Sequence, residues 1–258
     1  MLWNSWFVTM ILLWIRLLRS AGWDVIQLAA RMIKIKVNID FKKLSLNRVI
    51  RYFILSDLLL WGGWGLIGPI FALFVVDRIE GAGLVVVGAA AGIYWVVKSL
   101  FQIPVALFLD RHKGERDDFY TLVLSLILVG FTAMAFLLVH SVGGLFLVIF
   151  LQAIAFGCYT PSWSALFSRH LEKEHYAFDW SLDSTTIGLA SGATAFLGGA
   201  LASFFGFSTV FVLASILAFA SAFLLIMAPN LILPDTGGAE EEKKKPVLRD
   251  HLPGEVQK

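Results

Sequence analysis

Two ionisable side chains stand inside long apolar stretches of this chain, Asp57 within residues 52–76 and Lys98 within residues 84–109. A charge in such surroundings is costly in a bilayer, so it is by default a functional candidate with a partner. If both stretches are helices that cross a membrane, they run antiparallel and the two side chains can meet. The sequence therefore raises the hypothesis of an interior ion pair, with Asp57 as a possible proton acceptor.

Two simpler interpretations of these residues stay open. The Lys98 ammonium can reach the membrane interface along its flexible stem, and Asp57 can cap the start of its helix near the headgroups. Trp61 and Trp64 flank a Gly-Gly pair in the middle of the first stretch. They line a flexible kink, or they are lipid-facing bulk. Further side chains that can contact a solute are Tyr94, Trp95, Gln152, Tyr159, Trp163 and, nearer one end, Gln102.

The elements that hold these residues are membrane helices. Hydrophobic residues make up 58% of the chain and charged residues 16%, against about 25% charged in an ordinary soluble domain. A bilayer core needs about 20 apolar residues in a helix. We predict spans at Tyr52–Val76, Leu84–Leu109, Phe119–Val139, Gly143–Ser168, Leu182–Phe205 and Ser208–Ala228. The stretches lack the alternating pattern of a β-barrel, so the predicted fold is an all-α bundle of six transmembrane helices.

Basic residues predict the orientation of this bundle, because cytoplasmic loops carry an excess of Lys and Arg. They precede the first span, follow the second and the fourth, and return in the C-terminal tail, whereas Arg78 alone lies in the loops of the other side. Both flanks of the bundle are therefore expected in the cytoplasm, in the plasma membrane. The basic residues before the first span are also expected to attract anionic lipid headgroups.

The two ends of the chain have a different composition from the bundle. Residues 1–50 hold an apolar helix at 2–18, expected either to lie in the interface or to span as an extra helix, and then a basic linker. A start codon placed too early is a third explanation. Residues 51–229 form the six-helix domain, and residues 230–258, which contain an EEEKKK run, are expected to be a disordered cytoplasmic tail.

The loop after the second span carries Asp110, Arg111, Gly114 and Arg116. An aspartate at a helix end is stabilised near the N-terminus of a neighbouring helix, and arginines can bind carboxylates across the bundle. Together with Arg169 after the fourth span, these residues are candidates for a cytoplasmic gating clamp. The alternative is a solvated loop whose cations only set the topology.

Small residues recur along the fifth span, at Gly188, Gly192, Gly198 and Gly199. Small residues three or four positions apart allow helix backbones to approach closely in lipid. We expect these glycines to serve helix packing, with a direct gating role as the alternative.

Several of these motifs are similar to those of the major facilitator superfamily. The family's loop Gly-x-x-x-Asp-Arg-x-Gly-Arg-Arg/Lys resembles residues 106–116, although Ala106 replaces the first glycine, one extra residue precedes Gly114 and Glu115 replaces a basic residue. Further resemblances are Gly68-Pro69-Ile70 in the first span, residues 161–165 with Arg169, and residues 197–200 with 204–207. The Gly-Pro of the family's drug/proton antiporters is absent from residues 194–199, so that subgroup is not supported.

The resemblance implies a six-helix half, similar to the N-terminal half of a full transporter with its solute site between two halves. The expected function is secondary transport of a small solute by alternating access, as a homodimer or with another half, with possible proton coupling. The alternatives are a non-transporting membrane scaffold or assembly protein, or a truncated fragment of a full-length transporter. No catalytic set, cofactor motif, metal-ligand spacing or nucleic-acid partner is indicated, and Cys158 is the only cysteine.

Overall fold

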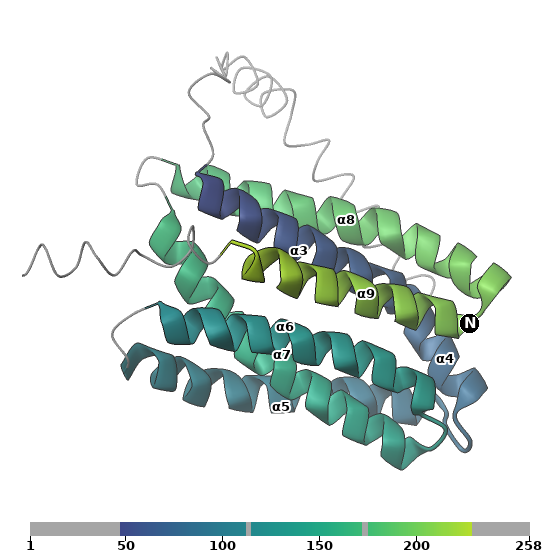
Figure 1. Cartoon of the computed structure of the whole chain (residues 1–258). Coiled ribbons are helices and arrows are strands. Elements are labelled where there is room, and N and C mark those ends of the chain that lie inside the picture. Colours follow the sequence, from purple (N-terminus) through teal and green to yellow (C-terminus); the bar gives the residue numbers. More distant parts are fainter. Residues whose placement is uncertain (1–46, 112–114, 172–174, 229–258) are drawn as a thin grey trace, which may run out of the picture. The chain divides into compact units, whose positions relative to one another are not determined.

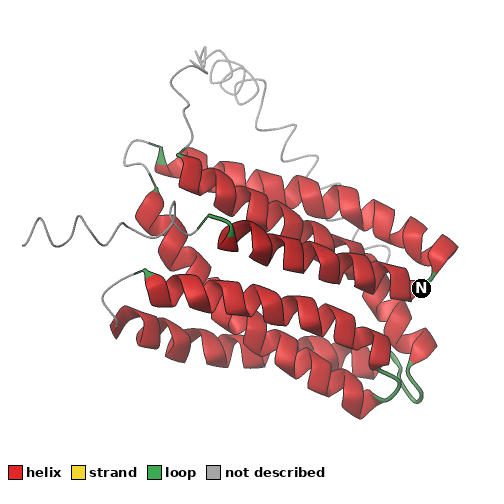
Figure 2. Cartoon of the chain, in the orientation of Figure 1, coloured by secondary structure: helices red, strands yellow, loops and turns green. Residues whose placement is uncertain are grey.

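The structure, a computed structural model, describes residues 47–111, 115–171 and 175–228, and these ranges are helical apart from short turns (Figure 1, Figure 2). The elements are α3 (Arg48–Ile67), η1 (Gly68–Ile70), α4 (Phe71–Arg78), α5 (Leu84–Arg111), α6 (Arg116–Ala135), η2 (Phe136–Leu138), α7 (Val142–His170), α8 (Tyr176–Phe205) and α9 (Phe207–Ile226). In this part of the chain, six helical segments are long and apolar enough to cross a membrane. The predicted six-helix, all-α fold is confirmed. The expectations for the N-terminal helix and the C-terminal tail fall outside the described residues.

The helices form two groups of three, which the upper and lower halves of Figure 1 show. In one group α3 packs against both α8 and α9, and in the other α7 packs against both α5 and α6. Contact between α6 and α9 joins the groups. One end of the bundle holds Arg48, Arg111, Arg116 and His170, where four of the helices begin or end. We call it the basic end.

Local chemistry explains where several helices begin. Asn47 caps α3, its Oδ1 accepting from the Val49 N–H at 3.1 Å, and Ser141 caps α7 by accepting from the Gly144 N–H at 3.2 Å. Gly206 joins α8 to α9 with φ +83°, a conformation that glycine adopts without steric cost. These caps satisfy N–H groups that the helices leave free.

Aromatic packing joins the two groups of helices, and a buried hydroxyl pair joins two helices within one group. Phe74 and Phe136 both pack their rings on Phe211, with centroids 4.7 and 5.2 Å away. The Ser56 and Ser221 hydroxyls are hydrogen-bonded at 2.7 Å between α3 and α9, entirely inside the bundle. Buried hydroxyls that bond across helices are a common means of association in lipid.

The glycines of α8 divide into two classes. A Cβ on Gly198 would lie 2.2 Å from the Leu66 carbonyl oxygen, so α8 approaches α3 closely at this glycine. At Gly188, Gly192 and Gly199 a Cβ would meet no described atom within 4 Å, so these three make no close helix contact within the described chain. The physical reason is that α8 rests on α3 along only one of its faces.

The kink that was one of the two interpretations of Trp61 and Trp64 does not form between them. Helix α3 runs unbroken through Gly62 and Gly63, and the first span changes to a 3₁₀ turn at η1, where Pro69 stands. Gly63 instead lets α9 approach, because its Cβ would lie 3.1 Å from the Ala214 carbonyl oxygen. Pro69 lacks an N–H, which explains the break at that point.

Candidate functional site

Asp57 lies in a closed polar cluster between α3, α7 and α8. Its Oδ1 accepts a hydrogen bond from the Tyr159 hydroxyl at 2.5 Å, and its side chain is 1% exposed. The Trp163 indole and the Asp183 carboxyl lie within electrostatic reach of it. We call these four residues the acid cluster. Asp57 stands about 14 Å along α3 from Arg48, at 1.5 Å per residue, so the cluster lies well inside the bundle from the basic end.

Asp183 is the residue of this cluster that the sequence analysis missed, since only Asp57 and Lys98 were counted as ionisable within spans. Helix α8 begins at Tyr176 rather than near Leu182, which places Asp183 about two turns inside it. Asp183 is 3% exposed, and its buried Oδ1 has no hydrogen-bond partner within the described chain. The available signal was an aspartate at the second position of the predicted span.

The proposed ion pair between Asp57 and Lys98 is not formed. Helix α5 packs against α7, and no ion pair of the described residues includes Lys98. Its ammonium nitrogen lies instead 5.1 Å from the centre of the Trp95 ring, 5.9 Å from Tyr94 and 6.0 Å from Phe156. The Phe156 ring of α7 packs on Trp61 and Trp64 of α3 and on Tyr94 of α5, so it lies between these two helices.

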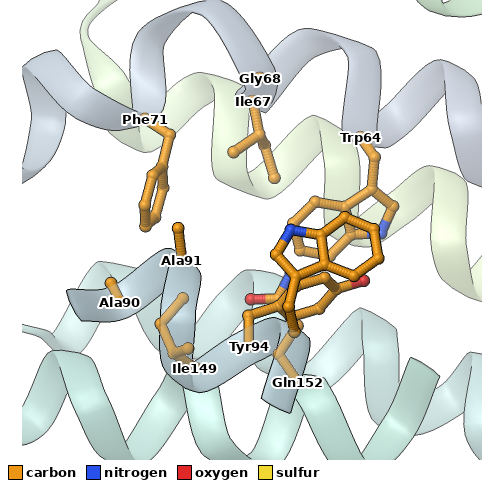
Figure 3. Close-up of a pocket in the computed structure, with 10 residues that line it drawn as sticks. Trp64, Ile67, Gly68, Phe71, Ala90, Ala91, Tyr94, Ile149 and Gln152 are labelled. Atoms are coloured by element: carbon orange, nitrogen blue, oxygen red, sulfur yellow. The ribbon is translucent and has the colours of Figure 1, made fainter. Parts of the chain in front are cut away.

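A cavity of about 240 Å³ opens between the first span, α5 and α7 (Figure 3). Figure 3 shows Trp64, Ile67 and Phe71 directed from the first span toward Ala91 and Tyr94 of α5. Apolar and aromatic groups form most of the wall. Its lining residues are Trp64, Ile67, Gly68, Phe71, Ala90, Ala91, Tyr94, Trp95, Ile149 and Gln152. This cavity brings together four of the predicted residues: Trp64, Tyr94, Trp95 and Gln152.

Gln152 is the polar contact that the cavity offers from α7. Its side chain is 7% exposed, and its Oε1 is buried without a hydrogen-bond partner among the described residues. An unpaired buried acceptor costs about 1–3 kcal/mol. The site therefore presents an unsatisfied acceptor in a largely apolar cavity.

Trp61 and Trp64 do not project into lipid as plain bulk. Their rings lie 5.9 and 5.4 Å from the Phe156 ring of α7. Trp64 faces the cavity, whereas the backbone carbonyl of Trp61 accepts from the Ser191 hydroxyl of α8 at 3.3 Å. Both tryptophans therefore link α3 to its neighbours.

The basic end carries an ionic contact, but its members differ from those predicted. Arg169 pairs with Asp118, a fully buried residue in the first turn of α6. Asp110, Arg111 and Arg116 are exposed, and no ion pair within the described ranges includes them. Of the proposed clamp, Arg169 is thus paired between helices, with Asp118 as the acid that sequence reasoning missed. Gly114 lies outside the described residues.

A second contact lies beside the first at the basic end. The His170 ring approaches Glu115 with 3.8 Å between Nε2 and Oε2, which joins the end of α7 to the residue before α6. The Asn47 side-chain amide donates to the His170 carbonyl oxygen at 3.4 Å. Helices α3, α6 and α7 are thereby linked at this end of the bundle.

Comparison with known proteins identifies the family of this bundle. Residues 53–252 match the Major Facilitator Superfamily. The chain belongs to this superfamily. The match covers all six helical spans, so family membership extends over the bundle and both the acid cluster and the cavity.

The comparison with solved structures gives a fold of the same kind. The chain is similar to the crystal structure of PepTSo, a POT family transporter, with a TM-score of 0.61 and 19% identity. The alignment covers 73% of this chain and 39% of PepTSo, so the chain spans well under half of that transporter. The comparison with curated proteins gives no match. The superfamily bundle described here therefore corresponds to one half of a transporter fold.

Proposed function

We propose that this protein is a half-transporter that moves a small solute across the plasma membrane by alternating access. The proposal rests on one observation: a six-helix half of the superfamily fold has a cavity between its first span, α5 and α7. In transporters built from two such halves, the solute binds between them and the halves rock around it. The basic residues of the sequence favour a cytoplasmic location for both flanks.

The second half is supplied by a second copy of this chain. In the most apolar part of each span, 6% of the residues of α5 and of α8 are buried inside the chain, against 44 or 50% in the other four spans. Both uncovered helices expose small residues with open space beside them, namely Gly88 and Gly92 on α5 and Gly188, Gly192 and Gly199 on α8. Such stripes let helices of two subunits approach closely.

The acid cluster is the proposed link to protons. Two carboxyls, Asp57 and Asp183, are buried close to each other in an apolar interior. Like charges so placed are not stable together, so the pair is expected to hold a proton. Release of that proton when the halves rock would couple the solute to the proton gradient. Tyr159 fixes the geometry by donating to Asp57.

The test combines subunit counting with uptake. The purified full chain is labelled once per copy and counted by single-molecule photobleaching in nanodiscs. In parallel, proteoliposomes with an imposed pH gradient are given a defined mixture of small metabolites, and their contents are measured by mass spectrometry. We expect dimers and solute accumulation above that of empty liposomes. A monomer that accumulates nothing overturns the proposal.

The Asp57→Asn variant tests the coupling within the same assay. The amide keeps the size and a hydrogen-bond acceptor for Tyr159 but cannot exchange a proton at this site. We expect accumulation driven by the pH gradient to be lost while exchange of solute at equal concentrations continues. A matched control is Asp77→Asn, because Asp77 is an exposed residue beside Arg78 at the other end of the bundle. Unchanged driven accumulation in Asp57→Asn contradicts proton coupling through the acid cluster.

A further inference from the structure

Lys98 is a cation inside a membrane span whose counter-ion is missing from the described chain. Its ammonium lies over the rings of Tyr94, Trp95 and Phe156. Aromatic faces attract a cation, but they do not neutralise it. A partner for such a charge is expected in the membrane, and no described carboxylate lies within ion-pair distance.

Lys98 is not itself a lining residue of the cavity, but its ammonium lies 5.9 and 5.1 Å from the ring centres of Tyr94 and Trp95, which do line it. Long side chains on a helix lean toward its N-terminus, over the residues three and four positions earlier. For Lys98 these are Trp95 and Tyr94, and both line the cavity. The backbone is fixed at this point, because a Cβ on Gly157 of α7 would lie 3.1 Å from the Lys98 carbonyl oxygen.

The other residues of the site indicate which further groups the ligand carries. Trp64, Tyr94 and Trp95 offer aromatic surface to a flat apolar body. Gln152 presents a buried, unpaired Oε1 on the α7 side, which calls for an N–H or O–H donor. Gln152 and Tyr94 line the same cavity (Figure 3), so a ligand bound there would face both the acceptor and the aromatic wall.

The carboxylates of the bundle do not offer this cavity a negative charge. Asp57 and Asp183 are 1% and 3% exposed, and neither lines the cavity. The Asp57 carboxyl is also engaged by Tyr159. A cationic solute in the cavity would therefore meet the Lys98 ammonium without a compensating acid.

We infer that the solute is a small aromatic organic anion that also carries an N–H or O–H donor. Its carboxylate binds Lys98, its ring lies among the three aromatic side chains, and its donor reaches Gln152. This inference rests on the proposed function, since it names the class of solute for the same cavity.

The test is equilibrium binding to the full chain in nanodiscs, with tritiated indole-3-acetate as the probe. Unlabelled tryptophol and tryptamine serve as competitors, since they share the indole ring but carry a hydroxyl or an amine in place of the carboxylate. We expect the acid to bind at least about tenfold more tightly than either, as charge-assisted hydrogen bonds are stronger than neutral ones. Tryptamine binding equal to or tighter than indole-3-acetate overturns the inference.

Substitutions test which residues produce the preference for the acid. Lys98→Met is expected to remove the preference for the acid over tryptophol, and Lys98→Arg to keep it. Arg111→Met is the matched control, because Arg111 is an exposed cation at the basic end and does not line the cavity. In Gln152→Leu we expect a smaller difference in binding affinity between indole-3-acetate and 1-naphthaleneacetate, because the latter lacks the ring N–H. An unchanged acid preference in Lys98→Met contradicts the assignment.

Uptake in proteoliposomes separates this inference from the proposed function. Selective binding of indole-3-acetate without uptake of any solute supports the inference and overturns the transport proposal. Uptake of neutral or cationic solutes, with no preference for the acid in binding, overturns the inference and supports transport.

Discussion

Helix α3 packs closely on α8 along one side, the closed side, and faces a cavity along the other, the open side. Polar groups on the two sides have different surroundings. Toward α8 the backbones meet at Gly198 and Leu66, and Asp57 lies sealed beside Tyr159. Toward α5 the same helix faces a cavity, with Gln152 unpaired and Lys98 lacking an anion in the described chain. The comparison teaches that polar groups on the closed side are sealed between packed helices, even where an oxygen such as Asp183 Oδ1 has no partner in the described chain. Those on the open side lie at or beside a cavity.

Exchanging one glycine on the closed side is expected to have the largest effect. In Gly198→Leu the new side chain starts 2.2 Å from the Leu66 carbonyl oxygen, so α3 and α8 must separate. Overpacking usually costs about 1–3 kcal/mol, and a clash with backbone is expected to exceed that range. We expect little monodisperse protein by size-exclusion chromatography and a strongly lowered melting temperature.

The neighbouring glycine is the matched control. A leucine side chain at Gly199 begins in open space within the described structure, so Gly199→Leu should leave the fold of each subunit intact. Because that face is proposed to meet a second copy, the variant should instead lower the dimer fraction counted by photobleaching. Equal melting temperatures for the two variants would contradict the division of α8 into a packed and an open face.

A smaller loss of stability is expected from Tyr159→Phe. It removes the hydroxyl that donates to Asp57 and leaves a buried carboxyl short of a partner, at a cost of about 1–3 kcal/mol. Thermal melting in nanodiscs measures the effect. Tyr120→Phe is the control, because Tyr120 is 59% exposed. If both variants melt alike, the hydrogen bond to Asp57 contributes nothing to the closed side.

Apolar length was sufficient to predict the six spans, since it reflects the thickness of the bilayer directly. The pairing of Asp57 was not predictable in this way. Whether its partner comes from α5 or from α7 depends on which helices are neighbours, and hydropathy does not encode this. Asp183 was missed as a candidate because the predicted span began too late in the chain. An aspartate about two turns inside α8 was therefore treated as part of a helix end.

The glycines of α8 show the same limit at the level of single faces. Small-residue spacing predicts close packing but does not say against what. In the structure one glycine meets α3 and three face open space. Under the proposed dimer, these three glycines would face the second copy, so the same sequence pattern would serve packing within a subunit and between subunits.

The smallest effect on stability, and one of opposite sign, is expected on the open side. Gln152→Leu replaces a buried acceptor that has no partner among the described residues with an apolar group of similar size. Removing an unsatisfied acceptor relieves a cost of about 1–3 kcal/mol, so the melting temperature should stay the same or rise. Binding of a solute that donates to this oxygen should fall about tenfold, the loss of a single hydrogen bond. A fall in both melting temperature and binding would show that Gln152 serves the fold, as Tyr159 does. A higher melting temperature together with weaker binding would indicate that Gln152 serves the solute, because functional sites commonly sacrifice stability.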